Sequence, residues 1–123
     1  MRRARAWVVA PGESKREWGR RGWRWLAVEA IWYPARPTLD EARTMFRRLW
    51  RFVSGLPCAE CRGHATAYLA EHPPSLGSSE ALQSWVWTFH NAVNRRLGKP
   101  HFSFARYRAL YEDELRAAAF GRD

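Results

Sequence analysis

The sequence predicts an all-α fold, a bundle of four helices with a short fifth helix. Apolar residues recur at the helical period along most of the chain, and proline or glycine ends each of these stretches. No segment alternates apolar and polar residues for long enough to form a convincing strand. The 123 residues are enough for one domain with one hydrophobic core.

The first two helices are expected on either side of a proline-rich turn. One apolar face of the first helix is formed by residues three or four apart, namely Trp23, Leu26, Ala27, Ala30 and Ile31. Pro34 and Pro37 end this helix, because proline lacks an N–H group and its ring clashes with the preceding turn. Thr38 followed by Glu41 is a capping-box pattern, which places the start of the second helix there, and Gly55 ends it.

The remaining helices follow from similar punctuation. Pro57 suits the first turn of a helix, so the third helix is expected to begin there and to run to about Glu71. Ser78 is the expected N-cap of a fourth helix that ends at Gly98, and Ser103 is that of the short fifth helix. The core stripe of the fourth helix is expected to be Leu82, Trp85, Val86, Phe89 and Val93. The fifth helix is expected to carry Phe104, Tyr107, Tyr111 and Leu115.

The two ends of the chain are expected to be tails around a single domain. The basic start is followed by the apolar run AWVVA, which is too short for the core of a signal peptide. We therefore expect a flexible N-terminal tail at residues 1–17, the functional domain at 18–116 and a C-terminal tail at 117–123. No stretch approaches the roughly eighteen apolar residues of a membrane span, so no membrane association is expected.

The chain is strongly basic, with a net charge of +9 that comes almost entirely from arginine. A charge of this sign attracts polyanions. A solvated basic surface is the simplest interpretation, followed by a phosphate-bearing ligand or an acidic partner. The sequence has no helix-turn-helix, zinc-finger or RNA-binding pattern, so specific nucleic-acid binding is not expected.

The stretch LPCAECRGH holds both cysteines of the chain, Cys58 and Cys61. Such a pair is a redox dithiol, part of a metal site or a structural disulfide. In a reducing compartment, a pair this close is more often catalytic or metal-binding than structural. The start of a helix lowers the pKa of a thiol, and Arg62 is expected to add positive charge beside the pair. In a redox dithiol, Cys58 would meet the substrate and Cys61 would resolve the mixed disulfide.

A zinc site is the less favoured alternative. Cys58, Cys61 and His64 have the spacing of metal ligands. A fourth ligand would come from the remaining histidines, which are His72, His90 and His101. Structural zinc usually takes two such cysteine pairs, and this chain has one, so no metal is expected. A c-type haem is excluded because Arg62, rather than a histidine, follows the second cysteine.

A second unusual stretch, WVWTFHNAVNRRLGKP, combines aromatic and polar residues. On a helix, His90 and Asn94 lie on one face, with Asn91 beside them. Polar groups next to an apolar stripe are costly unless they are hydrogen-bonded. A planar heterocycle with sugar hydroxyls and phosphates would satisfy them, and Arg95 and Lys99 would suit a pyrophosphate. A helix whose polar residues simply face solvent is an equally good interpretation.

Together these motifs resemble the Erv/ALR family of FAD-linked sulfhydryl oxidases, and the short viral members most of all. CAEC, HNAVNRRLGKP and the upstream WGRRGWRWL carry the resemblance, which covers residues 18–115. It implies a five-helix FAD-binding domain that is usually a homodimer. It also implies that Cys58 is the interchange thiol and that Cys61 lies next to the flavin. The residues that it assigns to FAD are Gly19, Arg20, Trp23, His64, His90, Asn91, Val93, Asn94, Leu97, Lys99, Phe102 and Tyr111.

The chain departs from the family pattern in three places. Ala27 stands where members usually carry a histidine, so one FAD contact is expected to be lost or replaced. Phe104 stands where cellular members often have a cysteine of a structural disulfide. Many members also carry a shuttle disulfide in a tail, but this chain has no third cysteine. A separate shuttle protein, or the substrate itself, is therefore expected to reach Cys58.

The expected function is FAD-dependent thiol oxidation. A thiol-containing substrate protein would be oxidised through a mixed disulfide at Cys58, with O2 as the final electron acceptor and H2O2 as its product. The expected location is the cytoplasm of a virus-infected cell, with the mitochondrial intermembrane space as the alternative. Two other classes stay open. One is a non-catalytic binding module that works through its basic surface, and the other is a flavin-free dithiol carrier.

Overall fold

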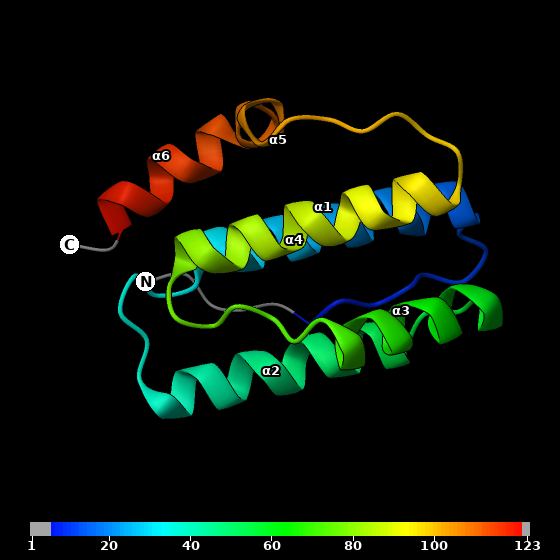
Figure 1. The fold of residues 1–123 in the computed structure, drawn as a ribbon, viewed down its shortest axis with the longest axis horizontal. Helices are drawn as coiled ribbons and strands as arrows, with labels where there is room; N and C mark the ends of the chain where they lie inside the picture. Colours follow the sequence, from blue (N-terminus) through cyan, green and yellow to red (C-terminus); the bar gives the residue numbers. More distant parts are fainter. Residues whose placement is uncertain (1–5, 122–123) are drawn as a thin grey trace.

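The computed structural model of the chain describes residues 6–121, and within them there are six α-helices and no β-strand. The helices are α1 (Lys15–Trp32), α2 (Leu39–Ser54), α3 (Ala59–Glu71), α4 (Ser79–Arg96), α5 (Phe104–Leu110) and α6 (Glu112–Gly121) (Figure 1). The outermost parts of the two expected tails, residues 1–5 and 122–123, lie outside the described residues. The predicted all-α fold is confirmed, with six helices in place of the expected five.

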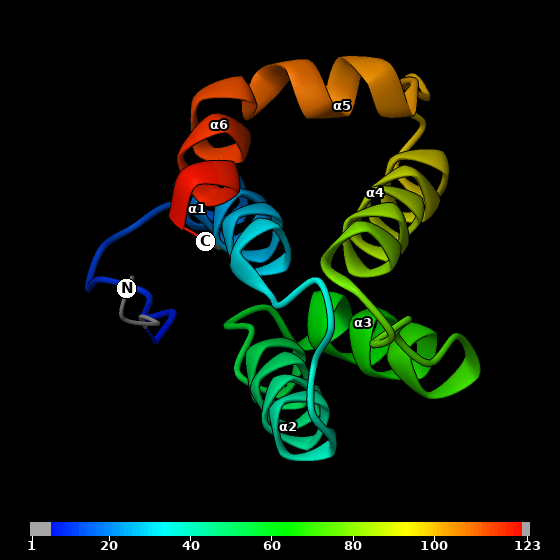
Figure 2. The same cartoon turned by 90° about the vertical axis from the view of Figure 1, so that its left-hand side faces the viewer.

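The helices form two packed pairs, with α5 and α6 across one side. α1 and α4 lie side by side and run in opposite directions. α2 packs against α3, and Figure 2 shows this second pair below the first. α5 crosses the side of the α1–α4 pair that is remote from α2, and α6 then packs on α1.

Side-chain caps at the helix starts agree with the sequence analysis. Thr38 and Glu41 form the predicted capping box of α2, in which the Thr38 hydroxyl accepts from the Glu41 N–H at 3.1 Å. Ser78 and Ser103 cap α4 and α5 as predicted. A further capping box, which begins at Ser14, starts α1. These caps satisfy N–H groups that the first turn of a helix leaves without partners.

The N-terminal segment is more ordered than a tail. α1 begins at Lys15, inside the region that was expected to be flexible. Within residues 6–14, Trp7 also packs on the bundle, because its ring centroid lies 4.7 Å from that of Phe52 on α2. The segment thus brings the start of α1 to a defined place.

The C-terminal part explains the additional helix. The expected fifth helix is interrupted at Tyr111, whose backbone leaves the helical conformation (φ −121°, ψ 27°). α6 then runs to Gly121, through residues that were expected to form a tail. Trp32 Nε1 of α1 donates a hydrogen bond to the Glu114 carboxylate at 2.8 Å, and Ala118 is fully buried. These contacts with α1 are not visible in the local sequence pattern.

The core lies between the two helix pairs and under α5. Its most deeply buried members include Leu26, Ala30, Ile31, Leu49, Val53, Leu82, Val86 and Tyr107. Ala27, where the family usually has a histidine, is also fully buried. Two polar links cross this core. The Glu29 carboxylate accepts from Arg48 at 2.6 Å, and the Ser79 hydroxyl donates to the Ala30 carbonyl at 2.7 Å.

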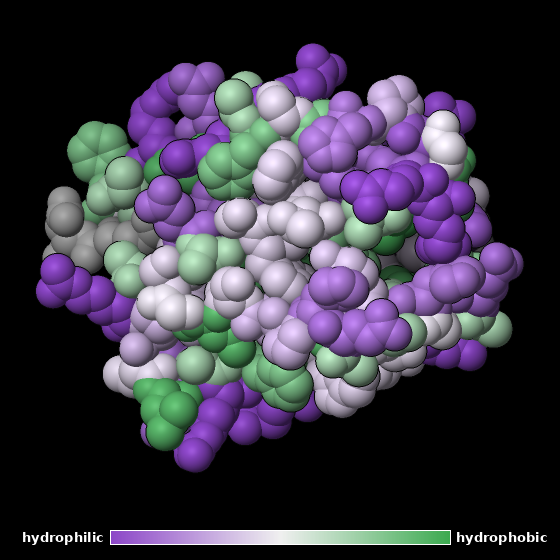
Figure 3. Space-filling view, in the orientation of Figure 1, coloured by the Kyte–Doolittle hydropathy of each residue, from purple (hydrophilic) through white to green (hydrophobic). Residues whose placement is uncertain are grey.

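The surface mixes many charged side chains with a few apolar ones (Figure 3). The exposed large apolar residues are Val8, Leu39, Phe46, Trp50, Leu97, Leu110 and Phe120. Three of them belong to α2. None of the helices in residues 6–121 has the combination of length and apolar character that a membrane crossing requires.

Candidate functional site

The cysteine pair stands at the start of α3. Cys58 is the N-cap of this helix, and Cys61 lies in its first turn. The Cys61 backbone N–H donates a hydrogen bond to Cys58 Sγ at 3.2 Å. Both thiols are half-buried against the core, and no disulfide joins them in this structure. The sequence placed the pair at a helix N-terminus, but α3 begins at Ala59 rather than at Pro57, so that Cys58 is the N-cap instead of a residue of the first turn.

The two thiols have different acidities. The pKa of Cys58 is below the ordinary thiol value, because the Cys61 thiol and the Cys61 N–H both hydrogen-bond to its sulfur. The pKa of Cys61 is raised, because burial disfavours its thiolate and Cys58 competes for the charge. Negative charge in the reduced pair is therefore favoured on Cys58, the residue expected to exchange with substrate.

The positive charge beside the pair comes from Lys15 rather than Arg62. The Arg62 guanidinium donates to the Leu56 carbonyl at 2.7 Å. α1 and α3 begin at the same end of the molecule (Figure 1), and this brings the Lys15 ammonium to the thiols. A hydrogen bond to Cys61 and the charges of both thiols raise the pKa of Lys15. The same ammonium contributes to lowering the pKa of Cys58.

We expect Lys15→Gln to raise the pKa of Cys58, since it removes a cation that favours the thiolate. Only the thiolate reacts with an alkylating agent. In the reduced protein, alkylation of Cys58 by iodoacetamide should therefore set in at a higher pH than in the wild type. Mass spectrometry of the peptides follows Cys58 and Cys61 separately.

Arg62→Gln is the matched control for this experiment. It removes a cation that is next in sequence to Cys61 but is directed to the Leu56 carbonyl. Its alkylation profile should coincide with that of the wild type. Equal shifts in the Lys15 and Arg62 variants would contradict the assignment of the charge to Lys15.

A cluster of rings forms a second part of the site. The Trp23 ring of α1 stacks on the His90 ring of α4, with centroids 3.9 Å apart and an angle of 4° between the planes. Phe102, from the connection between α4 and α5, meets the His90 ring edge-on at 5.0 Å. Burial, with a smaller effect of Lys99, lowers the pKa of His90 to about 4. His90 is therefore a neutral imidazole at pH 7.

The asparagines next to His90 hold the connection between α4 and α5. Asn91 is buried, and its side chain donates to the Phe102 carbonyl at 3.0 Å and accepts from the Phe102 N–H at 3.1 Å. Trp87 Nε1 donates to the same carbonyl at 2.8 Å. Asn94 donates to the Pro100 carbonyl at 3.4 Å. Both asparagines are thus hydrogen-bonded, and Asn91 together with Trp87 positions Phe102 beside His90.

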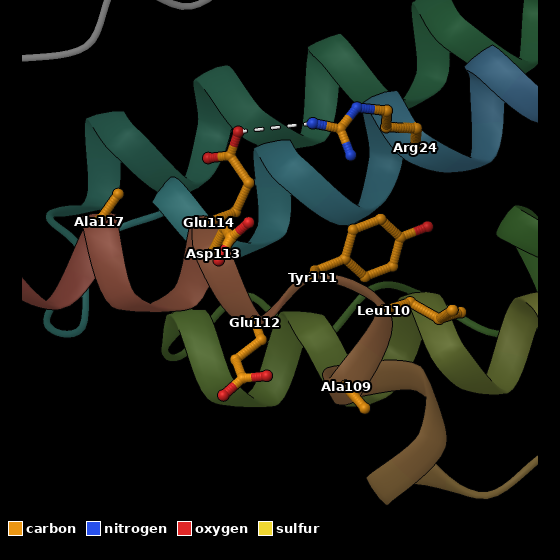
Figure 4. A pocket seen from close by; sticks show the side chains of 8 residues that line it. All are labelled: Arg24, Ala109, Leu110, Tyr111, Glu112, Asp113, Glu114 and Ala117. Atoms are coloured by element: carbon orange, nitrogen blue, oxygen red, sulfur yellow. Dashed lines mark ion pairs between the residues drawn. The ribbon is translucent and has the colours of Figure 1, made fainter.

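Tyr111 lies in a separate cavity at the junction of α5 and α6, beside α1. Figure 4 shows its ring between the two helical layers, with Arg24 of α1 above it. The cavity has a volume of about 350 Å³. Its lining residues are Arg24, Ala109, Leu110, Tyr111, Glu112, Asp113, Glu114 and Ala117. The cation of this cavity is Arg24, which also forms an ion pair with Glu114 at 3.6 Å.

The other residues that the resemblance assigned to FAD are spread around the same helices. Gly19 and Val93 are half-buried on α1 and α4. Those with mostly exposed side chains are Arg20, His64, Leu97 and Lys99. The sequence analysis did not single out Lys15, Arg24 or Tyr107 for the site. Their places depend on how helices pack, and no local motif marks them.

The residues present fit FAD. Tyr107, on α5, has a buried hydroxyl without a hydrogen-bond partner among residues 6–121, and a ligand acceptor would satisfy it. The neutral imidazole of His90, with the Trp23 ring stacked on it and the Phe102 ring edge-on to it, suits a planar heterocycle. Arg24 offers a cation for a phosphate. In the described part of the chain, no three residues of the His, Cys, Asp and Glu types gather to hold a metal ion.

A reactive cysteine pair at a helix start, in a small helical bundle with a ring cluster, defines a class of dithiol redox protein. The model of the Erv1 / Alr family matches residues 20–112. The chain belongs to this family, as its motifs predicted.

Named relatives and solved structures agree with this assignment. A "FAD-linked sulfhydryl oxidase" of African swine fever virus (isolate Pig/Kenya/KEN-50/1950) is 38% identical over 98 residues, which are 80% of this chain and 82% of the relative. The rice protein "FAD-linked sulfhydryl oxidase ERV1" is 38% identical over 80% of this chain and 50% of its own length. The yeast Erv1 core superposes with a TM-score of 0.79 at 30% identity, over 89% of this chain and 92% of that one. The FAD-binding domain of yeast Erv1 gives 0.73 at 33% identity, over 78% and 91%.

Proposed function

We propose that this chain is an FAD-linked sulfhydryl oxidase that forms disulfides in substrate proteins. The observation that carries the proposal is the unequal thiol pair at the start of α3. The pKa of Cys58 is lowered there, whereas burial raises the pKa of Cys61. The viral relatives that share 38% of their residues with it carry this name, and its fold matches an FAD-binding domain.

The reaction begins with the pair oxidised to a Cys58–Cys61 disulfide. A substrate thiolate attacks Cys58 Sγ, which forms a mixed disulfide and releases Cys61 as a thiolate. The second substrate thiolate then attacks the substrate sulfur of that mixed disulfide. The substrate leaves as a disulfide, and the reduced pair keeps two electrons. Lys15 lies where it stabilises the charge on the released thiols.

The reduced pair is returned to its disulfide by loss of two electrons. FAD, when bound, would accept this electron pair from Cys61 and pass it to O2 to give H2O2. Trp23, His90 and Phe102 are the ring residues that would hold it. Asn91 acts at one remove, because its amide fixes the Phe102 backbone. Overall, one substrate dithiol and one O2 give one disulfide and one H2O2.

The electron donor to Cys58 comes from outside these 123 residues, because they contain no third cysteine. We infer that a thiol-containing substrate protein, or a separate shuttle protein, reaches Cys58 directly. Cys58 precedes the helix and is half-buried at the surface, which leaves its sulfur open to attack.

The test is a visible absorption spectrum of the purified chain, followed by oxygen uptake on addition of a small dithiol. We expect a flavin spectrum and oxygen consumption with formation of peroxide. A colourless chain that does not bind added FAD would contradict the proposal. Disulfide exchange without oxygen uptake would instead support the flavin-free carrier.

We also propose that the chain forms a homodimer through α2. The exposed apolar face of α2 consists of Leu39, Ala42, Phe46 and Trp50, spaced three or four residues apart. Part of this face, Leu39, Ala42 and Phe46, lines a groove of about 340 Å³. The first turn of α2 carries acidic residues and its later turns carry arginines. Two α2 helices packed antiparallel would bring these opposite charges together.

Phe46→Asp is expected to separate the dimer into monomers, since it places like charges near the centre of a twofold contact. Sedimentation velocity measures the change, and circular dichroism shows that the helices persist. Phe120→Asp is the matched control, because Phe120 is the most exposed large apolar residue but lies on α6. A dimer that survives Phe46→Asp would place the interface on another face.

The location of the protein stays a prediction. The similarity to proteins of African swine fever virus agrees with the viral part of the expectation, and their names state no location. Relatives from two yeasts are named mitochondrial, and they support the intermembrane-space alternative.

A further inference from the structure

Among residues 6–121, two buried polar side-chain groups have no hydrogen-bond partner, the indole N–H of Trp7 and the hydroxyl of Tyr107, and only Tyr107 lies at the candidate site. Tyr107 is 2% exposed, and its hydroxyl has no hydrogen-bond partner among residues 6–121. A buried hydroxyl without a partner costs free energy, and native structures contain few of them. The deeply buried Tyr33 follows the usual rule, since its hydroxyl donates to the Leu76 carbonyl at 2.7 Å.

Tyr107 lies between the two parts of the candidate site. Its ring centroid is 6.1 Å from that of Phe102, which in turn contacts His90. On its other side, the Tyr111 ring meets it edge-on at 5.4 Å. On each side, Tyr107 therefore contacts an aromatic residue that the family resemblance assigned to FAD. The resemblance did not assign Tyr107 itself.

The chemistry of this hydroxyl is that of a donor. Burial raises the pKa of Tyr107 far above the ordinary value of a phenol, so the hydroxyl keeps its proton at any physiological pH. A second ring, Phe104, stacks on Tyr107 with an angle of 17° between the planes and limits its rotation. A ligand that offers a nitrogen or oxygen acceptor between Phe102 and Tyr111 would meet a fixed donor.

We propose that the Tyr107 hydroxyl donates a hydrogen bond to FAD. The proposal rests on the proposed function, because it requires that the chain binds this cofactor. It adds to the proposed binding site a residue from α5, between Phe102 and Tyr111.

Tyr107→Phe tests the proposal, because it removes only the hydroxyl and keeps the ring. FAD is titrated into the flavin-free chain, and thermal unfolding is recorded without FAD and with saturating FAD. We expect the Kd for FAD to rise about three- to tenfold, the range for loss of one hydrogen bond. The increase in Tm caused by FAD should become smaller. The Tm without FAD should stay the same or rise, because the variant no longer buries an unpaired hydroxyl.

Tyr33→Phe is the matched control, because it removes a hydroxyl that has a protein partner away from the site. It should lower the Tm without FAD and leave the Kd for FAD unchanged. An unchanged Kd in Tyr107→Phe would overturn the proposal. A fall in the FAD-free Tm of Tyr107→Phe as large as that of Tyr33→Phe would also overturn the proposal. Such a fall would mean that the Tyr107 hydroxyl already has a partner, either within the protein or a buried water. If the wild-type chain binds no FAD, the proposed function itself fails. If the wild type binds FAD and only the Kd of Tyr107→Phe is unchanged, the role of Tyr107 fails and the proposed function stands.

Discussion

Cys61→Ser is expected to abolish thiol oxidation while leaving FAD bound. In the proposed mechanism, Cys61 is the thiol that passes electrons to FAD, and serine cannot form or break a disulfide. Oxygen uptake with a small dithiol should fall by about a thousandfold or more, as is usual when a reacting nucleophile is removed. The flavin absorption of the purified variant should match that of the wild type, because the rings assigned to FAD are untouched.

Cys58→Ser is the matched control, because it also stops turnover but for another reason. In Cys61→Ser, the remaining Cys58 thiol should attack a small disulfide, keep half of it as a mixed disulfide and release the other half as a thiolate. Mass spectrometry detects that adduct. Cys58→Ser should form it much more slowly, because the pKa of Cys61 is raised by burial. Full oxygen-dependent activity in Cys61→Ser, or equal adduct formation in the two variants, would show that the roles are assigned incorrectly.

Arg48→Met is expected to destabilise the fold by about 3 kcal/mol, the typical result when one partner of a buried ion pair is removed. Glu29 is 3% exposed, and its carboxylate lies 2.6 Å from the Arg48 guanidinium. The guanidinium also lies over the Trp25 ring, 5.3 Å from its centroid. Without Arg48, the buried carboxylate loses a cation that helps to compensate its burial. Urea unfolding followed by circular dichroism measures the free energy of unfolding.

Two further variants test whether the burial of this ion pair causes the loss of stability. Glu29→Met combined with Arg48→Met should recover most of the lost stability, since the buried carboxylate is then removed together with the cation that faces it. Arg116→Met breaks an exposed pair with Glu112, whose side chains are 62% and 72% exposed. It should change the free energy of unfolding by less than about 1 kcal/mol. If Arg48→Met costs no more than Arg116→Met, then solvent screens the Arg48–Glu29 pair.

Most of the helices could be predicted because their signals are local. The capping box at Thr38, the caps at Ser78 and Ser103 and the proline breaks all lie next to the turns that they determine. The ends of the chain were less predictable. α6 gains its stability from contact with α1, through Trp32 and Ala118, and no pattern within residues 112–121 shows that contact.

Part of the candidate site could be predicted from the sequence, and part of it could not. Cys58 and Cys61 could be placed at a helix start from their own neighbours in the sequence, and the family resemblance supplied the expected partners of FAD. The source of the charge beside them could not be predicted. Arg62 is adjacent in the chain, but its guanidinium is taken by the Leu56 carbonyl, whereas Lys15 reaches the thiols from another helix.

The amino-acid sequence alone determined the helical class and the starts of α2, α4 and α5, because each depends on neighbours within one or two turns. The redox interpretation of the cysteine pair came from its spacing together with the family resemblance. Only the tertiary structure decided that Trp23 stacks on His90, that Asn91 holds Phe102 and that Tyr107 buries an unpaired hydroxyl between Phe102 and Tyr111. These contacts join residues far apart in the chain. They arise from the way in which whole helices exclude water and pack, and that arrangement is a property of the complete core.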